Sequence, residues 1–335
     1  MKAFLSLIFL FFLSSGVQAQ SSENLVLITL DGFRWQELFR GASEELILTE
    51  PENEKANSEK FRYREKLMPF MWGVIASEGF IAGNQDCGSI VRVHNRFGFS
   101  YPGYNELLTG KRDLRIHSNR KKWNPNRNVL EVINSEEQYK GKVSVHSTWD
   151  AMPYIINAKR SEIKVYSSQQ DEHKRKERKG LFTNDSLTYV SALASLKKNE
   201  SKVVYISFDA TDEKAHRAEY GNYLEAANRI DKYIESLWAY CQSDSNYKDK
   251  TTFLITTDHG RGYSKKWSEH GLLVSGSKNI WLAGIGPAVI KAGEMENEKP
   301  LYQNQIAAAL LNVLGIKKKL PKTAGKSPKR LLSAR

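Results

Sequence analysis

The feature that most constrains the fold of this chain is a set of three apolar, β-branched runs that each lead into an acidic residue. The runs, with the acid that follows each, are Leu25–Leu30 with Asp31, Val203–Phe208 with Asp209, and Thr252–Thr256 with Asp258. Runs of this length and composition are typical of buried strands. Because they alternate with helical patterns, the sequence predicts an α/β fold, a three-layer sandwich with a mostly parallel central sheet.

Shorter apolar runs and helical patterns complete this framework. Further strands are predicted at Lys142–His146, Ile163–Tyr166 and Asn279–Leu282. Helices are predicted at Leu67–Ser77, Val129–Asn134, Ser186–Lys197, Tyr220–Tyr240 and Gln303–Leu314. Two polar stretches, Glu44–Glu65 and Gln169–Gly180, interrupt the pattern, and we interpret them as solvated insertions.

The first 19 residues have the pattern of a secretory signal peptide. Lys2 precedes an apolar run from Ala3 to Leu13, and small residues then lead to Ala19. A membrane anchor is the alternative, but about 20 apolar residues are needed to span a bilayer. We therefore expect cleavage after Ala19 and a periplasmic or secreted protein without a transmembrane segment.

The positive charge of the chain is concentrated near its C-terminus. The sequence has 50 Lys and Arg against 38 Asp and Glu, and eight of the basic residues but no acid lie in 317–335. Residues 20–316 carry only +3 of the net charge of +12, which does not favour a nucleic-acid partner. With 40% hydrophobic residues, we expect 20–316 to form one globular domain and 317–335 a basic, mobile tail.

The chain has two cysteines, Cys87 and Cys241. Two are too few for a disulfide scaffold or a thiolate metal site in a chain of this length. An exported protein can form disulfides, so the sequence leaves open whether these two pair or remain separate thiols.

Two of the strands are followed by candidate metal ligands. Asp31 precedes Gly32, although a strand followed by Asp-Gly also describes many plain turns. Asp212 and His216 are four residues apart, so one helical turn would place both on the same face, as a metal site requires. A capping aspartate with an exposed histidine is the alternative interpretation of that pair.

The third strand end adds nitrogen ligands. Asp258 is followed by His259 and Gly260, and a turn at the glycine would let both side chains reach one ion. His270 follows shortly afterwards. Together with Asp31, Asp212 and His216, these residues provide six oxygen and nitrogen ligands, enough for two divalent ions of zinc type.

Ser100 is the candidate nucleophile. It lies two residues before Pro102, which suits the first turn of a helix, so Ser100 is expected near a helix N-terminus. Free backbone N–H groups at that position favour a phosphoryl oxygen or an alkoxide. Taken alone, the motif also fits a simple N-cap serine.

In this order, the motifs resemble those of the alkaline phosphatase superfamily, near its type I phosphodiesterase/nucleotide pyrophosphatase branch. They are Asp31-Gly32, Ser100-x-Pro102 followed by Leu108-Thr109-Gly110, Asp212-x-x-x-His216, Asp258-His259-Gly260 and the lone His270. The resemblance implies that Asp212, His216 and His270 hold one zinc ion, and that Asp31, Asp258, His259 and the Ser100 oxygen hold the other. It also implies that Ser100 attacks phosphorus and forms a phosphoseryl intermediate that water hydrolyses.

Departures from related families narrow the expected chemistry. Sulfatases of this superfamily carry an arginine where this chain has Tyr104, which argues against sulfate esters and for an unmodified Ser100. Relatives use an asparagine to bind the phosphoryl oxygen. Asn119 is the candidate, while Asn105, Asn124 and Asn126 compete for the role, and Lys111, Arg112 or Arg115 could act instead. We therefore expect an exported hydrolase of small phosphate mono- or diesters. A sulfatase, a phosphonate hydrolase and a non-catalytic metal- or anion-binding relative are the alternatives.

Overall fold

The computed structural model describes residues 21–50, 58–169 and 184–333. The predicted signal peptide and most of the polar stretch that begins at Gln169 lie outside these residues. Among the residues described, no helix has both the length and the apolar character needed to cross a membrane. Cys87 and Cys241 are free thiols rather than a disulfide.

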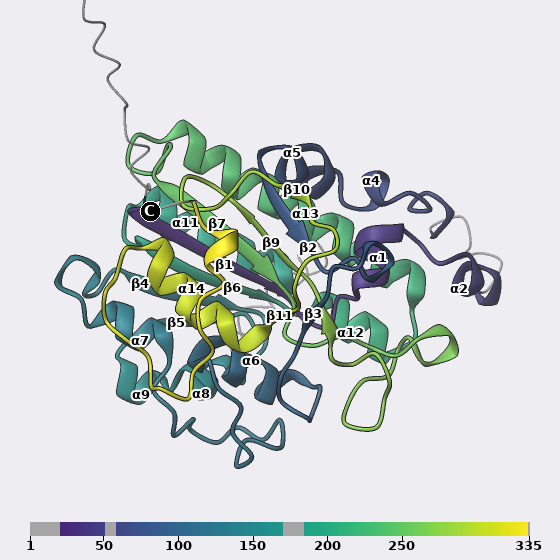
Figure 1. Cartoon of the computed structure of the whole chain (residues 1–335), viewed down its shortest axis with the longest axis horizontal. Coiled ribbons are helices and arrows are strands. Elements are labelled where there is room, and N and C mark those ends of the chain that lie inside the picture. The colour runs from purple at the N-terminus through teal and green to yellow at the C-terminus, as the bar shows by residue number, and fades with distance from the viewer. Residues whose placement is uncertain (1–20, 51–57, 170–183, 334–335) are drawn as a thin grey trace, which may run out of the picture.

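An eight-stranded sheet with the order β10-β2-β9-β7-β1-β6-β4-β5 runs through the centre of the molecule (Figure 1). Neighbouring strands are parallel except where they pair with β9 (Leu282–Ile285). The other strands are β1 (Asn24–Leu30), β2 (Gly79–Ala82), β4 (Val143–Ser147), β5 (Lys164–Ser167), β6 (Val203–Phe208), β7 (Thr251–Thr256) and β10 (Gly293–Glu294). The predicted α/β class with a mostly parallel sheet is confirmed.

Each face of the sheet packs against its own layer of helices, because side chains alternate along every strand. In β1, Leu25 and Leu27 join one apolar cluster, while Val26 and Ile28 join the other. The first cluster includes α6 (Ser100–Thr109), α7 (Val129–Asn134), α8 (Met152–Ile156) and α14 (Ile306–Val313). The second includes α1 (Trp35–Arg40), α2 (Glu44–Thr49), α11 (Asn184–Lys197), α12 (Ala210–His216) and α13 (Tyr220–Ser243). The result is the expected three-layer sandwich.

Two predicted elements are divided in the structure. The expected strand Asn279–Leu282 is two strands, because the chain passes at Trp281 from β8 (Asn279–Ile280), in a three-stranded sheet with β3 (Val91–Arg92) and β11 (Leu301–Tyr302), into β9. The expected helix Leu67–Ser77 is α4 (Arg64–Leu67), a π-helical turn Met71–Ile75 and α5 (Ala76–Glu78). Pro69 explains the break, since the residue before a proline avoids helical geometry.

The C-terminal segment packs against the domain over its described residues, 317–333, so the expectation of a loose tail does not hold there. The Gly325 N–H donates to the Gly110 carbonyl at 2.9 Å, and the Ile290 N–H donates to the Leu331 carbonyl at 3.2 Å. Leu331 is buried within the first apolar cluster. The basic residues of this segment therefore accompany apolar ones that hold it in place.

Candidate metal and nucleophile site

Three adjacent parallel strands end at the same edge of the sheet and bring the candidate ligands together. Asp31 follows β1, Asp258 and His259 follow β7, and α12 begins directly after β6. The structure forms two ligand groups, in each of which the ligand atoms lie within 4.8 Å of one another. We call Asp31, Asp258 and His259 the inner group, and Asp212, His216 and His270 the outer group. Apart from the Ser100 oxygen, these are the two sets of side chains that the resemblance to the alkaline phosphatase superfamily implied.

The inner group is buried and has unpaired carboxylate oxygens. Asp31, Asp258 and His259 are each at most 1% exposed. The Nε2 atom of His259 lies 3.4 Å from Asp31 Oδ1 and 3.6 Å from Asp258 Oδ2, and neither of these oxygens accepts a hydrogen bond. Burial, and then repulsion from neighbouring aspartates, raises the pKa of Asp31 well above its usual value and that of Asp258 to about 7. Buried oxygens left without donors are costly, and a bound cation would satisfy them.

The second oxygen of each inner carboxylate is held by a donor from the protein. The Tyr104 hydroxyl donates to Asp31 Oδ2 at 2.8 Å, and the Gly32 N–H donates to Asp258 Oδ1 at 3.1 Å. The Ser207 hydroxyl donates to Tyr104 in turn, at 3.1 Å. These contacts leave one oxygen of each acid directed toward His259. Sequence reasoning missed this contact of Tyr104, although its spacing of four residues from Ser100 indicates the same face of a helix.

The outer group is built from α12 and from the loop after β7. Asp212 and His216 share one face of α12 as predicted, with His216 Nε2 3.0 Å from Asp212 Oδ2. His270 Nε2 lies 3.0 Å from His216 Nε2. His270 Nδ1 lies 3.3 Å from the Gly98 carbonyl, which makes Nδ1 the donor and leaves Nε2 free to bind a metal. Unlike the inner group, this one reaches solvent, because the His216 side chain is 52% exposed.

Arg261 is a second residue that the sequence did not indicate. Its guanidinium is buried and ion-paired with Asp212 Oδ1. Burial alone would raise the pKa of Asp212, but Arg261 and the neighbouring histidines lower it below its usual value. Gly32 permits this packing, because it has φ of +57° and a Cβ there would lie 2.8 Å from Arg261 Nε and from Asp212 Oδ1.

Gly260, expected to supply a turn, is required instead by close packing. A Cβ at this position would lie 2.2 Å from the Asn279 carbonyl oxygen. Its φ is not among the positive values found in the described residues. The glycine therefore allows the segment after His259 to approach the Asn279 backbone.

Ser100 is the first residue of α6 and lies beside the inner group. Its hydroxyl oxygen is 3.4 Å from His259 Nε2. The Asn119 side-chain oxygen accepts the Tyr101 N–H at 3.0 Å, which places Asn119 next to the nucleophile candidate. The competing asparagines bond to one another instead, since the amides of Asn124 and Asn126 both donate to Asn105, at 3.2 and 3.0 Å.

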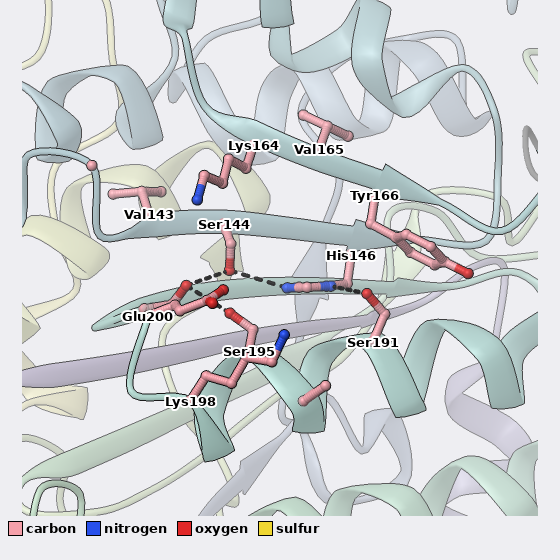
Figure 2. A pocket seen from close by; sticks show the side chains of 13 residues that line it. Val143, Ser144, His146, Lys164, Val165, Tyr166, Ser191, Ser195, Lys198 and Glu200 are labelled. Atoms are coloured by element: carbon pink, nitrogen blue, oxygen red, sulfur yellow. Dashed lines mark hydrogen bonds between the residues drawn. The ribbon is translucent and has the colours of Figure 1, made fainter.

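A separate cavity of about 490 Å³ lies between β4, β5 and α11 and is lined by none of the candidate metal ligands (Figure 2). His146 extends from β4 with its Nε2 3.1 Å from the Ser144 hydroxyl and its Nδ1 2.9 Å from the Ser191 hydroxyl. Burial lowers the pKa of His146 to about 4. Since both ring nitrogens have partners, we assign this histidine a structural role.

The fold is similar to the folds of an alkaline phosphatase and other solved structures. The alkaline phosphatase PafA superposes with a TM-score of 0.64 at 10% identity, covering 94% of this chain and all of that one. The lipoteichoic acid synthase LtaP from Listeria monocytogenes gives 0.63 at 15% identity, covering 95% and 80%. Murine ectonucleotide pyrophosphatase/phosphodiesterase 5, solved with AMP, gives 0.59 at 11% identity, covering 92% and 100%.

A family model makes the assignment more specific. The chain belongs to the type I phosphodiesterase/nucleotide pyrophosphatase family, whose model matches residues 96–272. That range begins before Ser100 and ends after His270. No curated protein sequence matches the chain.

Proposed function

We propose that this protein is an exported phosphohydrolase that cleaves phosphate mono- or diesters through a phosphoseryl intermediate on Ser100. Family membership supports phosphoester chemistry. The apolar leader at 1–19 supports export. The position of Ser100, 3.4 Å from a candidate ligand of the inner group, is the observation that carries the proposal.

The donor sets fit two divalent ions of zinc type. Asp31, Asp258, His259 and the Ser100 oxygen would hold one ion, and Asp212, His216 and His270 the other. The orphaned oxygens of Asp31 and Asp258 support this fit, because a buried carboxylate without a donor calls for a cation. When bound, such ions lower the pKa of an attacking oxygen and offset the charge of a transferring phosphoryl group.

The reaction would proceed in two steps, with Ser100 as the nucleophile of the first. The Ser100 oxygen attacks phosphorus as the bond to the leaving oxygen breaks, and its proton passes to solvent or to the leaving group. Water then attacks the phosphoseryl phosphorus and releases Ser100 and phosphate or a phosphomonoester. The N-terminus of α6 and the amide of Asn119, which bonds to the Tyr101 N–H, would hold the phosphoryl oxygens.

The test is an assay of purified protein on p-nitrophenyl phosphate, bis-p-nitrophenyl phosphate and p-nitrophenyl sulfate, each with and without chelator. We expect chelator-sensitive turnover of one or both phosphate esters and none by Ser100→Ala. Turnover that resists the chelator or survives Ser100→Ala would refute this mechanism.

A sulfatase or phosphonate hydrolase is the second candidate, because phosphonate and sulfate ester hydrolases share the fold. Against a sulfatase stands Tyr104, which occupies the position of the sulfatase arginine and bonds to Asp31. Faster turnover of the aryl sulfate than of either phosphate ester would favour this alternative.

A further inference from the structure

The two ligand groups carry different charges. The inner group has two carboxylates, and across the described residues neither Asp31 nor Asp258 is paired with a lysine or arginine. The outer group has one carboxylate, Asp212, which is paired with the guanidinium of Arg261. With both carboxylates ionised, as metal binding requires, and with neutral imidazoles, the inner group has a formal charge of about −2, whereas the outer group together with Arg261 is close to neutral.

Arg261 is fixed where it stands. Its Nε donates to the Gly32 carbonyl at 3.2 Å, and its Nη1 donates to the Ser268 carbonyl at 2.5 Å. The side chain is buried, and the absence of a side chain at Gly32 makes room for it. A cation in the outer group would therefore share Asp212 with the guanidinium of Arg261, whose position is fixed by its hydrogen bonds and burial.

The two ligand groups also differ in their exposure to solvent. His259 is fully buried, whereas the side chain of His216 is 52% exposed. An ion in the outer group would thus lie beside a solvent-exposed ligand, while the ligands of the inner group are buried. Charge and access both favour retention of an inner ion and exchange of an outer one.

We propose that Arg261 weakens the outer group, so that the two groups bind divalent ions with unequal affinity. The inner group binds first and tightly, and the outer group binds second and exchanges with free metal. This inference rests on the two ligand groups of the proposed function. It assigns Arg261 the role of a positioning residue that holds one oxygen of Asp212 and sets how readily the outer ion leaves.

The experiment is a titration of metal-free, full-length mature protein with Zn²⁺ against a chromogenic chelator, without substrate. Two binding steps are expected, separated by at least about tenfold in Kd. His216→Ala should remove only the weaker step, and Asp258→Asn should remove only the tighter one. Two equal steps, or loss of the tighter step in His216→Ala, would overturn the inference.

A matched pair of variants isolates the charge of Arg261. Arg261→Gln keeps hydrogen-bond donors without the charge and should tighten the weaker step by about tenfold or more. Arg261→Lys keeps the charge and should leave that step weak. If Arg261→Gln loosens the outer ion, Arg261 supports Asp212 instead of opposing the metal, and the proposal fails.

Two controls keep the result interpretable. Because Arg261 is buried, its variants are compared after circular dichroism shows a native fold; if they do not fold, the wild-type and His216→Ala titrations still decide the inequality. Binding is measured apart from turnover, so equal steps in a protein that hydrolyses bis-p-nitrophenyl phosphate refute only this inference. The absence of any Zn²⁺ binding refutes the proposed function as well.

Discussion

Two of the buried clusters of polar side chains among the described residues differ in whether their atoms have partners. At the strand ends, Asp31 and Asp258 each keep one oxygen without a donor. Beneath α11, His146 and its neighbouring serines form a continuous chain of hydrogen bonds (Figure 2). A buried polar group that lacks a partner is destabilising, whereas one with partners is close to neutral.

The difference separates a site from a structural network. The strand-end cluster is incomplete by itself, and burial, together with repulsion from neighbouring aspartates, raises the pKa of Asp31 and Asp258. The cluster beneath α11 needs nothing from outside, because Ser201 donates to Ser144 at 2.8 Å and pairs with Ser195 at 2.9 Å. Changes in the first cluster should therefore alter activity and metal binding, and changes in the second should alter stability.

The largest expected effect is the loss of turnover when Ser100 is substituted, and substitution of a serine beneath α11 is its control. Ser100→Ala should lower phosphate-ester turnover by at least about 10³-fold, because it removes the attacking oxygen. Ser195→Ala, in the network beneath α11, should leave turnover within about twofold of wild type. Rates on bis-p-nitrophenyl phosphate at saturating Zn²⁺ would show this, and similar losses in both variants would erase the distinction.

Buried aspartates provide the second contrast. Asp258→Asn should lose the tighter metal step yet raise the stability of the metal-free protein at pH 8 by at least about 1 kcal/mol, since a repelling charge is removed. Asp231 is the control, because its two oxygens accept the N–H groups of Phe70 and Met71 at 2.7 and 3.0 Å. Asp231→Asn should keep both metal steps and gain no stability.

Urea denaturation and Zn²⁺ titration of the same samples would test this contrast. A metal-free Asp258→Asn protein less stable than wild type would mean that the strand-end carboxylates are structural.

The proximity of the candidate ligands could be predicted because their positions follow from topology. Asp31, Asp212 and Asp258 come after strands that end at one edge, and parallel strands bring such ends together without further information. The helical spacing of Asp212 and His216 likewise determined that they share a face. No local pattern revealed that Asn279–Leu282 crosses between two sheets, because its apolar residues suit either sheet.

The supporting residues could not be predicted in the same way. From the sequence alone, Tyr104 is typical of a core aromatic residue on a helix, and Arg261 is typical of a surface arginine in a polar loop. Their contacts with Asp31 and Asp212 join segments far apart in the chain, and they depend on how α6 and the loop after β7 pack. Residues that act through another side chain are therefore harder to recognise in a sequence than the candidate ligands themselves.

A smaller effect is expected from Tyr104. Tyr104→Phe should lower Zn²⁺ affinity at the tighter step by about 10- to 100-fold, because the hydroxyl no longer holds Asp31 Oδ2 and the carboxylate loses its orientation. Tyr205 is the control: its hydroxyl bonds to Thr29 at 3.1 Å and to none of the six candidate ligands. Tyr205→Phe should leave both metal steps unchanged, and equal losses in the two variants would indicate a general loosening of the core.

The smallest effect on activity is expected from His146, whose influence should appear only as a pH dependence of stability. Its folded-state pKa of about 4 lies below its ordinary value near 6.5, so its stabilising effect is complete above about pH 6.5 and is lost as the pH falls toward 4. A shift of this size corresponds to about 3 kcal/mol across that window. His146→Gln should therefore be less stable than wild type at pH 7.5 but should lose less stability on acidification.

The measurement is urea denaturation of metal-free wild type, His146→Gln and His117→Gln between pH 4 and 7.5, with turnover recorded at pH 8. His117 is exposed, so its variant should keep the wild-type slope. Turnover of His146→Gln should stay within about twofold, because its partners are the serines beneath α11 and not the strand-end ligands. If His146→Gln abolished turnover without lowering stability, the network beneath α11 would belong to the catalytic site, and the contrast between the two clusters would collapse.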